Sequence, residues 1–264
     1  MIFRTTLKTL SVAIATASLL AGGAAFAGDQ GGQTAINQPT AKQSEARKVA
    51  ESAANVLRNQ MQQPANKRIP KAIVDDARCI GVFPSVLKAG FVVGGSHGDG
   101  LVSCRNSSGK WSTSAPAYFE LSSGSVGFQA GAQSSELIMV FMTKRSAQDL
   151  TSGKLKLGAD IGVAAGPAGL HGKVNTAPAP VLTYRMDQEG AFAGAEIKGA
   201  VISADEDTNQ QVYGQQIKAK DLLFGSHRVP SQAKPFAEAL EQFAPAQAYN
   251  TSINVKHPNS SAYE

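Results

Sequence analysis

The chain has 264 residues and a net charge of +5 at neutral pH, with 42% hydrophobic and 17% charged residues. This mildly basic charge does not by itself indicate nucleic-acid binding. The only two cysteines lack C-x-x-C spacing, which gives redox catalysis and a zinc site little support. Outside the N-terminus, no apolar run reaches the roughly 20 residues that a membrane span needs.

Residues 1–27 have the three regions of a secretory signal peptide. Arg4 and Lys8 give a positive start, residues 10–20 form an apolar core, and residues 25–27 form a small-residue cleavage pattern. We therefore expect cleavage near Ala27 and export to the periplasm or the medium. Removing these 27 residues, with their two basic side chains, leaves 237 residues and a net charge of +3.

Residues 28–42 are polar and aperiodic, which predicts a flexible lead. A helix capped by Ser44 is expected to run to about Met61, because its apolar residues recur at i, i+3 and i+4. Seven basic residues against two acidic ones accompany it: Lys42, Arg47, Lys48, Arg58, Lys67, Arg68 and Lys71. Such a helix either lies on an anionic membrane or docks its alanine-rich face on a sheet, and the sequence leaves both placements open.

The following segments predict a short helix and an antiparallel meander. Pro70 is expected to start the helix, and a buried strand from Cys79 is expected to end at Pro84. Short runs bounded by turn residues come next: a strand over 90–95, a turn over 96–100, a strand over 101–105 and a turn over 106–109.

Cys79 and Cys104 are expected to form a disulfide, because an even cysteine count in an oxidising compartment favours pairing. Closing this loop would contribute about 3 kcal/mol. The alternative is a pair of buried free thiols.

Glycines four residues apart recur along the chain, most densely between Gly124 and Gly169. In a strand, residues i and i+4 share a face, so each run has a bare stripe where another backbone approaches or the sheet bends. The runs are Gly90, Gly94 and Gly98; Gly127 and Gly131; Gly158, Gly162 and Gly166; and Gly190 and Gly194. They predict one strongly coiled, mainly antiparallel sheet that is partly closed and barrel-like. A small-xxx-small membrane helix is disfavoured, because charged residues interrupt every window: Glu136, Lys154, Lys156 and Asp160.

The C-terminal part predicts a helical turn, a hairpin and three helices. The helical turn covers 144–150, and the hairpin joins 178–186 to 191–201. The helices are expected over 205–213, 220–224 and 232–243, before a loose polar tail. Together these elements predict an α+β protein with one domain over 43–225, followed by a C-terminal helix and tail over 226–264.

The search for chemistry finds no catalytic site, metal site or cofactor motif. The four histidines are not at ligand spacing, and no G-x-S-x-G or P-loop occurs. His97 and Asp99 share the predicted turn, where they act as a metal or acid–base pair or simply form a solvated tip. Asp160, in an apolar run, is expected to accept a backbone hydrogen bond. Trp111 is expected to anchor the core.

Several segments, in this order, resemble the SYLF domain found in actin-patch and lipid-binding proteins and in exported bacterial proteins. They include IPKAIVDDARCIGVFPS, KWSTSAPAYF, SVGFQAGAQSSELIMVFMT and KLGADIGVAAGPAG, and the similarity covers residues 44–225. The resemblance implies binding of anionic phospholipid through the basic segment between Lys42 and Lys71. Some members of this family also bind actin, so the resemblance makes an actin-binding role a second expectation. The family has no catalytic residues to carry over to this chain.

The sequence therefore predicts an exported, non-enzymatic module that binds anionic phospholipid or the cell-envelope surface. It needs no cofactor or nucleic acid, and the mature chain has no transmembrane span. The expected lipid-binding residues are the seven basic ones above together with two near strand ends, Lys88 and Arg105. The alternative is a structural or protein-binding module, like an actin-binding scaffold, that receives a partner in a groove of the glycine-rich sheet.

Overall fold

The computed structural model describes residues 39–90, 93–106, 109, 111, 115–126, 131–166, 179–187, 190–191, 197 and 199–244. The expected signal peptide, most of the expected lead and the tail after Ala244 lie outside these residues. Residues from Pro39 onward belong to one compact unit.

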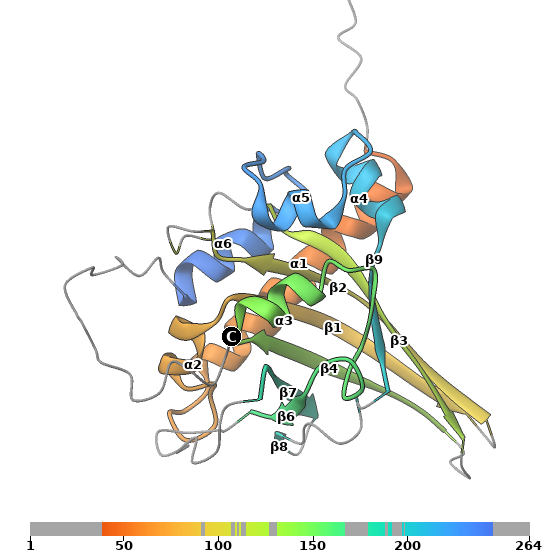
Figure 1. Ribbon diagram of the computed structural model, residues 1–264, viewed down its shortest axis with the longest axis vertical. Helices are drawn as coiled ribbons and strands as arrows, with labels where there is room; N and C mark the ends of the chain where they lie inside the picture. The colour runs from red at the N-terminus through yellow and green to blue at the C-terminus, as the bar shows by residue number, and fades with distance from the viewer. Residues whose placement is uncertain are drawn as a thin grey trace, which may run out of the picture. The chain divides into compact units, whose positions relative to one another are not determined.

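Nine strands of the described chain form one sheet (Figure 1). Its order is β5-β9-β3-β2-β1-β4-β7-β6, and β8 also pairs with β7. The strands are β1 (Cys79–Gly90), β2 (Val93–Cys104), β3 (Ala117–Val126), β4 (Gly131–Phe141), β5 (Lys154–Lys156), β6 (Val163–Ala165), β7 (Val181–Asp187), β8 (Gly190–Ala191) and β9 (Val201–Ala204). Neighbours are antiparallel except β6 and β7, so the predicted α+β fold with a mainly antiparallel, half-closed sheet is confirmed.

Helices cover both faces of this sheet because its central strands alternate large apolar residues between the two sides. One face packs against α1 (Ala41–Gln62), α2 (Lys71–Asp76), α4 (Glu206–Tyr213) and α6 (Lys234–Phe243). The other packs against α3 (Lys144–Asp149) and α5 (Ala219–Phe224). In β1, Ile80 and Val82 belong to the first core and Phe83 belongs to the second. The domain therefore has two cores with the sheet between them.

A bulge in β1 corrects the predicted end of this strand at Pro84. β1 continues to Gly90, and its register shifts between Val82 and Leu87 against β2 and between Phe83 and Val86 against β4. A proline is tolerated at such an irregularity because one residue there is left out of the ladder.

Two glycines of β2 lie against this bulge. A Cβ at Gly98 would lie 2.7 Å from the Ser85 carbonyl oxygen, and a Cβ at Gly100 would lie 2.5 Å from that of Val82. Glycine therefore permits the close backbone approach that its frequent use predicted. Both glycines lie inside β2, so the predicted turn over 96–100 is wrong.

The four-residue glycine spacing correctly predicted a sheet, but glycines of one run do not lie along one strand as expected. Gly90 and Gly94 lie opposite each other across the β1–β2 hairpin rather than along one strand. Gly158, with φ +81°, forms a turn that divides the predicted strand into β5 and β6. Gly127 and Gly194 lie outside the described residues.

The helices largely confirm the sequence prediction. α1 begins earlier than expected, because Thr40 and Gln43 form a capping box and Ser44 lies inside the helix. α3, α4, α5 and α6 lie where helical segments were expected. The predicted final hairpin is partly wrong: β7 pairs with β8, but the chain from Val201 forms β9, which pairs with β3 and β5.

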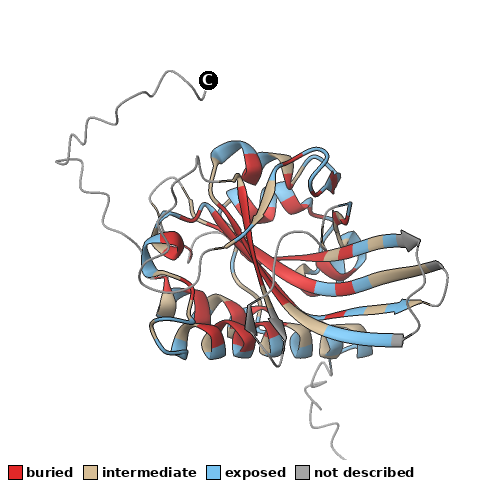
Figure 2. Cartoon of the chain, turned by 90° about the horizontal axis from the view of Figure 1, so that it is seen from below, coloured by how far each residue is buried: buried red, intermediate tan, exposed pale blue. Residues whose placement is uncertain are grey.

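Beyond the bulge, β1 to β4 continue past both cores as a four-stranded extension, which we call the arm. It consists of residues 86–90, 94–99, 122–126 and 131–135. Among its described residues, only Val86 belongs to either core. Figure 2 shows the buried colour of the strands changing to intermediate and exposed along this extension.

Candidate functional site

The apolar stripe of α1 is buried against the sheet, which resolves the two placements that the sequence left open. Ala46, Ala50, Ala53 and Leu57 are buried in the core that includes residues of β1, β2 and β4. The hydroxyl of Tyr118 on β3 donates a hydrogen bond to the Ala46 carbonyl oxygen at 3.2 Å. In this position, the helix cannot offer its apolar face to a membrane.

The basic side chains of this region lie on the outer side of α1, the turn after it and α2. We call six of them the basic surface: Arg47, Lys48, Arg58, Lys67, Arg68 and Lys71. All are exposed or half-exposed. Two make ion pairs one helical turn away, Arg47 with Glu51 at 2.8 Å and Lys71 with Asp75 at 2.7 Å. Among the described residues, the other four make no ion pair, so their charge is available to an anionic surface.

Lys42 and Lys88 lie apart from the basic surface. Lys42 is 4.0 Å from a carboxylate oxygen of Asp207 at the start of α4. Lys88 lies in the arm, where it pairs in register with Ser96 of β2 and Gln133 of β4. The residues of α1 instead pack against the half of the strands before the bulge. The structure therefore places six of the nine predicted residues on α1, the turn after it and α2, and the other three elsewhere or in other contacts.

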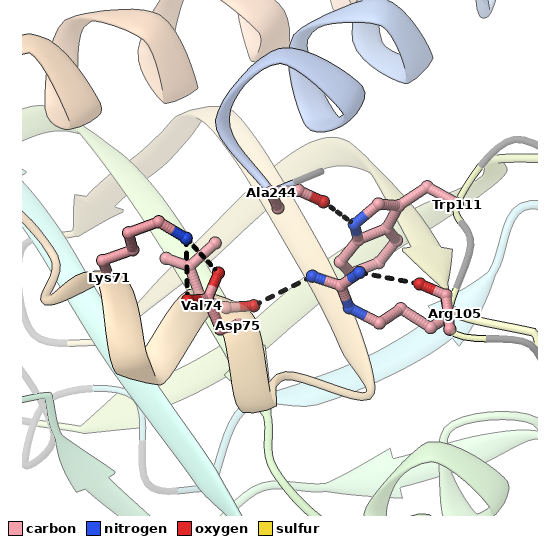
Figure 3. A network of polar contacts seen from close by, with 7 residues as sticks. Lys71, Val74, Asp75, Arg105, Trp111 and Ala244 are labelled. Atoms are coloured by element: carbon pink, nitrogen blue, oxygen red, sulfur yellow. Dashed lines mark hydrogen bonds and ion pairs between the residues drawn. The ribbon is translucent and has the colours of Figure 1, made fainter. Parts of the chain in front are cut away.

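Arg105 makes internal contacts, as Figure 3 shows. Its guanidinium donates hydrogen bonds to the carbonyl oxygens of Gly109 at 2.8 Å and Val74 at 3.3 Å. It also lies 4.4 Å from the ring centroid of Trp111. Partial burial lowers the pKa of Arg105, and the carboxylate of Asp75 acts in the opposite direction. Arg105 thus joins the end of β2 to α2 instead of extending the basic surface.

Trp111 confirms the prediction of a core anchor. Its side chain is 2% exposed, and its indole Nε1 donates a hydrogen bond to the Ala244 carbonyl oxygen at 2.6 Å (Figure 3). Ala244 directly follows α6, so Trp111 and Arg105 join α6 and α2 to the end of the sheet where β2 finishes.

His97 and Asp99 lie on β2 within the arm, and not in a turn. Histidine Nε2 is 3.4 Å from a carboxylate oxygen of Asp99, and both side chains are more than half exposed. The described residues contain no cluster of three metal-ligating side chains. Asp160 accepts a hydrogen bond from the Lys156 amide at 2.8 Å, as expected for a structural acid.

Asn209 of α4 is a polar residue that the sequence analysis missed. It is fully buried, its side chain accepts from the Tyr118 amide at 2.8 Å, and it donates to the Tyr118 carbonyl oxygen at 3.0 Å. It thereby acts as a strand partner at the edge of β3. Burial raises the pKa of Tyr118, whose hydroxyl contacts α1. The residues around it, DEDTNQQ, are all polar, so nothing in the sequence marked this asparagine as buried.

Cys79 and Cys104 form the predicted disulfide, which joins opposite positions of β1 and β2 at the end away from the arm. None of the described helices has the length and apolar character required to cross a membrane.

Residues 122–243 match the family described as Ysc84, Las17-binding protein actin regulator. The chain carries a Ysc84 domain. Its curated relatives include SH3 domain-containing YSC84-like protein 1, which is 34% identical over 78% of this chain and 60% of the protein in Bos taurus. The Rattus norvegicus protein of the same name is 34% identical over 83% of this chain and 64% of its own length.

A yeast relative extends the comparison further. LAS seventeen-binding protein 3 of Saccharomyces cerevisiae is 27% identical over 79% of this chain and 46% of its own length. The chain thus spans between 46% and 64% of the length of these relatives. The SYLF resemblance noted in the sequence is the same family.

Proposed function

We propose that this Ysc84 domain is a non-enzymatic module that binds anionic phospholipid through its basic surface. One observation carries the proposal: α1 buries its apolar stripe in the domain and leaves its basic side chains outside. Binding is then electrostatic and peripheral, since the apolar face of α1 is not free to enter the bilayer.

The strength of this contact follows from the charges that are not already paired. Lys48, Arg58, Lys67 and Arg68 make no ion pair among the described residues, and each basic residue near an anionic surface contributes about 1 kcal/mol. Four such contributions correspond to a millimolar dissociation constant, roughly 4 kcal/mol. Binding should therefore be weak, and salt should suppress it because exposed charges are screened over about 8 Å at physiological ionic strength.

We further propose that the chain is exported and meets this lipid at the cell envelope. The signal-like residues 1–27 support this location, and so does a buried disulfide, which persists in oxidising compartments.

Vesicle co-sedimentation tests the lipid proposal. Vesicles of phosphatidylcholine alone are compared with vesicles that also contain phosphatidylglycerol, at low and high salt. The triple variant Arg58→Gln, Lys67→Gln, Arg68→Gln should bind the anionic vesicles on the order of 100-fold more weakly, since three contributions of about 1 kcal/mol are lost.

A matched control removes the same charge elsewhere. Lys154, Lys156 and Lys220 are exposed on β5 and α5, and their replacement by glutamine should leave most of the binding in place. Equal loss in both triple variants would show a nonspecific effect of net charge. Equal pelleting with neutral and anionic vesicles would refute the proposal.

A protein partner is the second candidate, because the family is described as an actin regulator and an aromatic side chain is exposed at the end of α5. A hollow of about 510 Å³ there is lined by residues that include Ile217, Lys220, Phe224 and His227. Phe224 is 40% exposed. Co-sedimentation with actin filaments, using Phe224→Ser as the variant, tests this candidate, and loss of pelleting in the variant would support it.

A further inference from the structure

We infer that the arm is a self-association site, at which the open edge of β4 pairs with β4 of a second copy of the chain. β7 pairs with β4 only from Glu136 to Phe141. Residues 131–135 continue past this pairing, and no strand of the described chain covers their outer edge. Such an edge presents unpaired backbone groups to any strand that can reach it.

The register shows which backbone groups point outward. The amide of Met142, next after β4, donates to the Pro180 carbonyl oxygen on the β7 side. Backbone groups in an antiparallel strand alternate between its two neighbours, so every second residue before Met142 also faces that side. Within the open part of the strand, these residues are Ser134 and Ala132. Their N–H and C=O groups therefore point away from β1, on the side that no strand of the described residues covers.

This edge lacks the features that keep sheets from pairing. Charged residues, prolines and bulges are the usual protection of an exposed edge. Residues 121–135 contain neither a charged residue nor a proline, and the bulge next to the arm lies in the inner strand β1. The short strand β5, at one end of the sheet order, instead has two exposed lysines, Lys154 and Lys156.

The open edge is complementary to itself. In an antiparallel pair centred on Gln133, Ala132 of one copy lies opposite Ser134 of the other, and the two exchange both of their main-chain hydrogen bonds. Ala132, Gln133 and Ser134 are exposed and carry no charge, so nothing on the edge repels a copy of itself. The closed two-fold arrangement that results is the commonest form of homodimer.

The charge of Lys88 does not oppose this pairing. Lys88 lies on β1, one strand inside β4, so the two copies of Lys88 would be three strand spacings apart, roughly 14 Å. This distance exceeds the screening length of about 8 Å at physiological ionic strength. β3 is a poorer candidate, because β9 covers it up to Ser122 and leaves a shorter open edge.

The contact is small, so the dimer should be weak. A five-residue strand on each side falls below the roughly 1,000 Å² of a stable interface. We therefore expect dimerisation only at high protein concentration in solution. The inference does not depend on lipid binding, and it is tested without vesicles.

Sedimentation velocity of the full chain over a wide concentration range is the first test. Ser134→Pro removes the outward N–H and leaves the main-chain bonds to β1 in place. Ser134→Ala keeps that N–H and is the matched control, because both variants lose the hydroxyl contact of Ser134 with Ser85 of β1 at 3.0 Å. The wild type and Ser134→Ala should form a concentration-dependent dimer, and Ser134→Pro should remain a monomer with an unchanged circular-dichroism spectrum. A wild type that stays monomeric throughout, or a dimer that persists in folded Ser134→Pro, overturns the inference.

Disulfide capture gives a second test that needs no proline. Gln133→Cys places two thiols at opposite positions of the paired strands, which is the arrangement that Cys79 and Cys104 have within one chain. Mild oxidation should link Gln133→Cys into a covalent dimer and leave the exposed control Ser52→Cys, on α1, largely monomeric. Equal linkage of both variants would show random collision and overturn the inference, even if Ser134→Pro fails to fold.

Discussion

The same four strands build two different regions, the half of the sheet between the helices and the arm. Before the bulge, the strands contribute large, fully buried side chains such as Phe83, Phe119 and Ile138. In the arm, the residues are mostly glycine, serine and alanine, and few are buried. A helix can cover a strand only where the strand offers apolar area to bury. The arm is therefore held mainly by its ladder and by cross-strand contacts such as that between Ser96 and Ser123 at 2.6 Å.

The largest expected contrast comes from truncating one apolar side chain in each region. Phe119→Ala should lower the free energy of unfolding by about 3–5 kcal/mol, because it leaves a cavity in a closed core. Leu87→Ala in the arm should change it by no more than about 0.5 kcal/mol, because Leu87 is already 51% exposed. Urea unfolding measures both values. Similar costs would mean that the arm is covered in solution.

The disulfide links β1 and β2 in the half of the sheet between the helices, at the end farthest from the arm. Replacing both Cys79 and Cys104 by alanine should lower the free energy of unfolding, measured in urea, by about 3.5 kcal/mol, since the bond closes a loop with a sequence separation of 25 residues.

Hydrogen exchange of the wild type should show the amides of the arm opening at a lower free energy than those of the half of the sheet between the helices, because the arm adds few buried contacts. If the arm amides of the wild type are as well protected as those of Ile80 and Leu101, the comparison between the two regions fails.

The sequence predicted those features that depend on local chemistry. Apolar periodicity located α1, the aspartate at the start of α4 located that helix, and the even cysteine count indicated the disulfide. The run from Ser96 to Gly100 was predicted to be a turn, because glycine and aspartate favour turns. Its true role depends on the bulge of the neighbouring strand, which is a tertiary contact that no local pattern contains.

The candidate site shows the same division between local and distant information. The residues of the basic surface all lie within one segment of the sequence, residues 47–71, so they could be found by their charge alone. Arg105 was grouped with it, but this arginine meets Trp111 and Val74 only after the sheet has formed. Asn209 was missed because its burial depends on α4 packing against β3, which is far away in the sequence.

Glycine substitutions should separate the bulge from the rest of the arm. Gly100→Ala brings a Cβ to 2.5 Å from the Val82 carbonyl oxygen and 2.6 Å from the Phe83 ring, so we expect a loss of about 1–3 kcal/mol. Gly124→Ala meets nothing within 4 Å, and it should be neutral or stabilise by up to about 1 kcal/mol, because alanine restricts the unfolded chain. Thermal or urea unfolding measures the stability of the two variants. An equal loss of stability at both sites would contradict the close backbone approach assigned to the bulge.

The smallest effect is expected at Glu136, the last β4 residue that β7 covers before the arm. Partial burial raises the pKa of its carboxyl group. A folded-state pKa above the unfolded value means that stability is fully present below the unfolded value, about pH 4.3, and declines as pH rises through the folded value. Glu136→Gln should therefore raise the free energy of unfolding at pH 7 by a few tenths of a kcal/mol, roughly, with the gain disappearing at low pH. Glu238→Gln, which removes an exposed charge paired with Lys234 on α6, should bring no gain. A gain from Glu136→Gln that persists at low pH would show that packing, and not the charge at the boundary of the arm, is responsible.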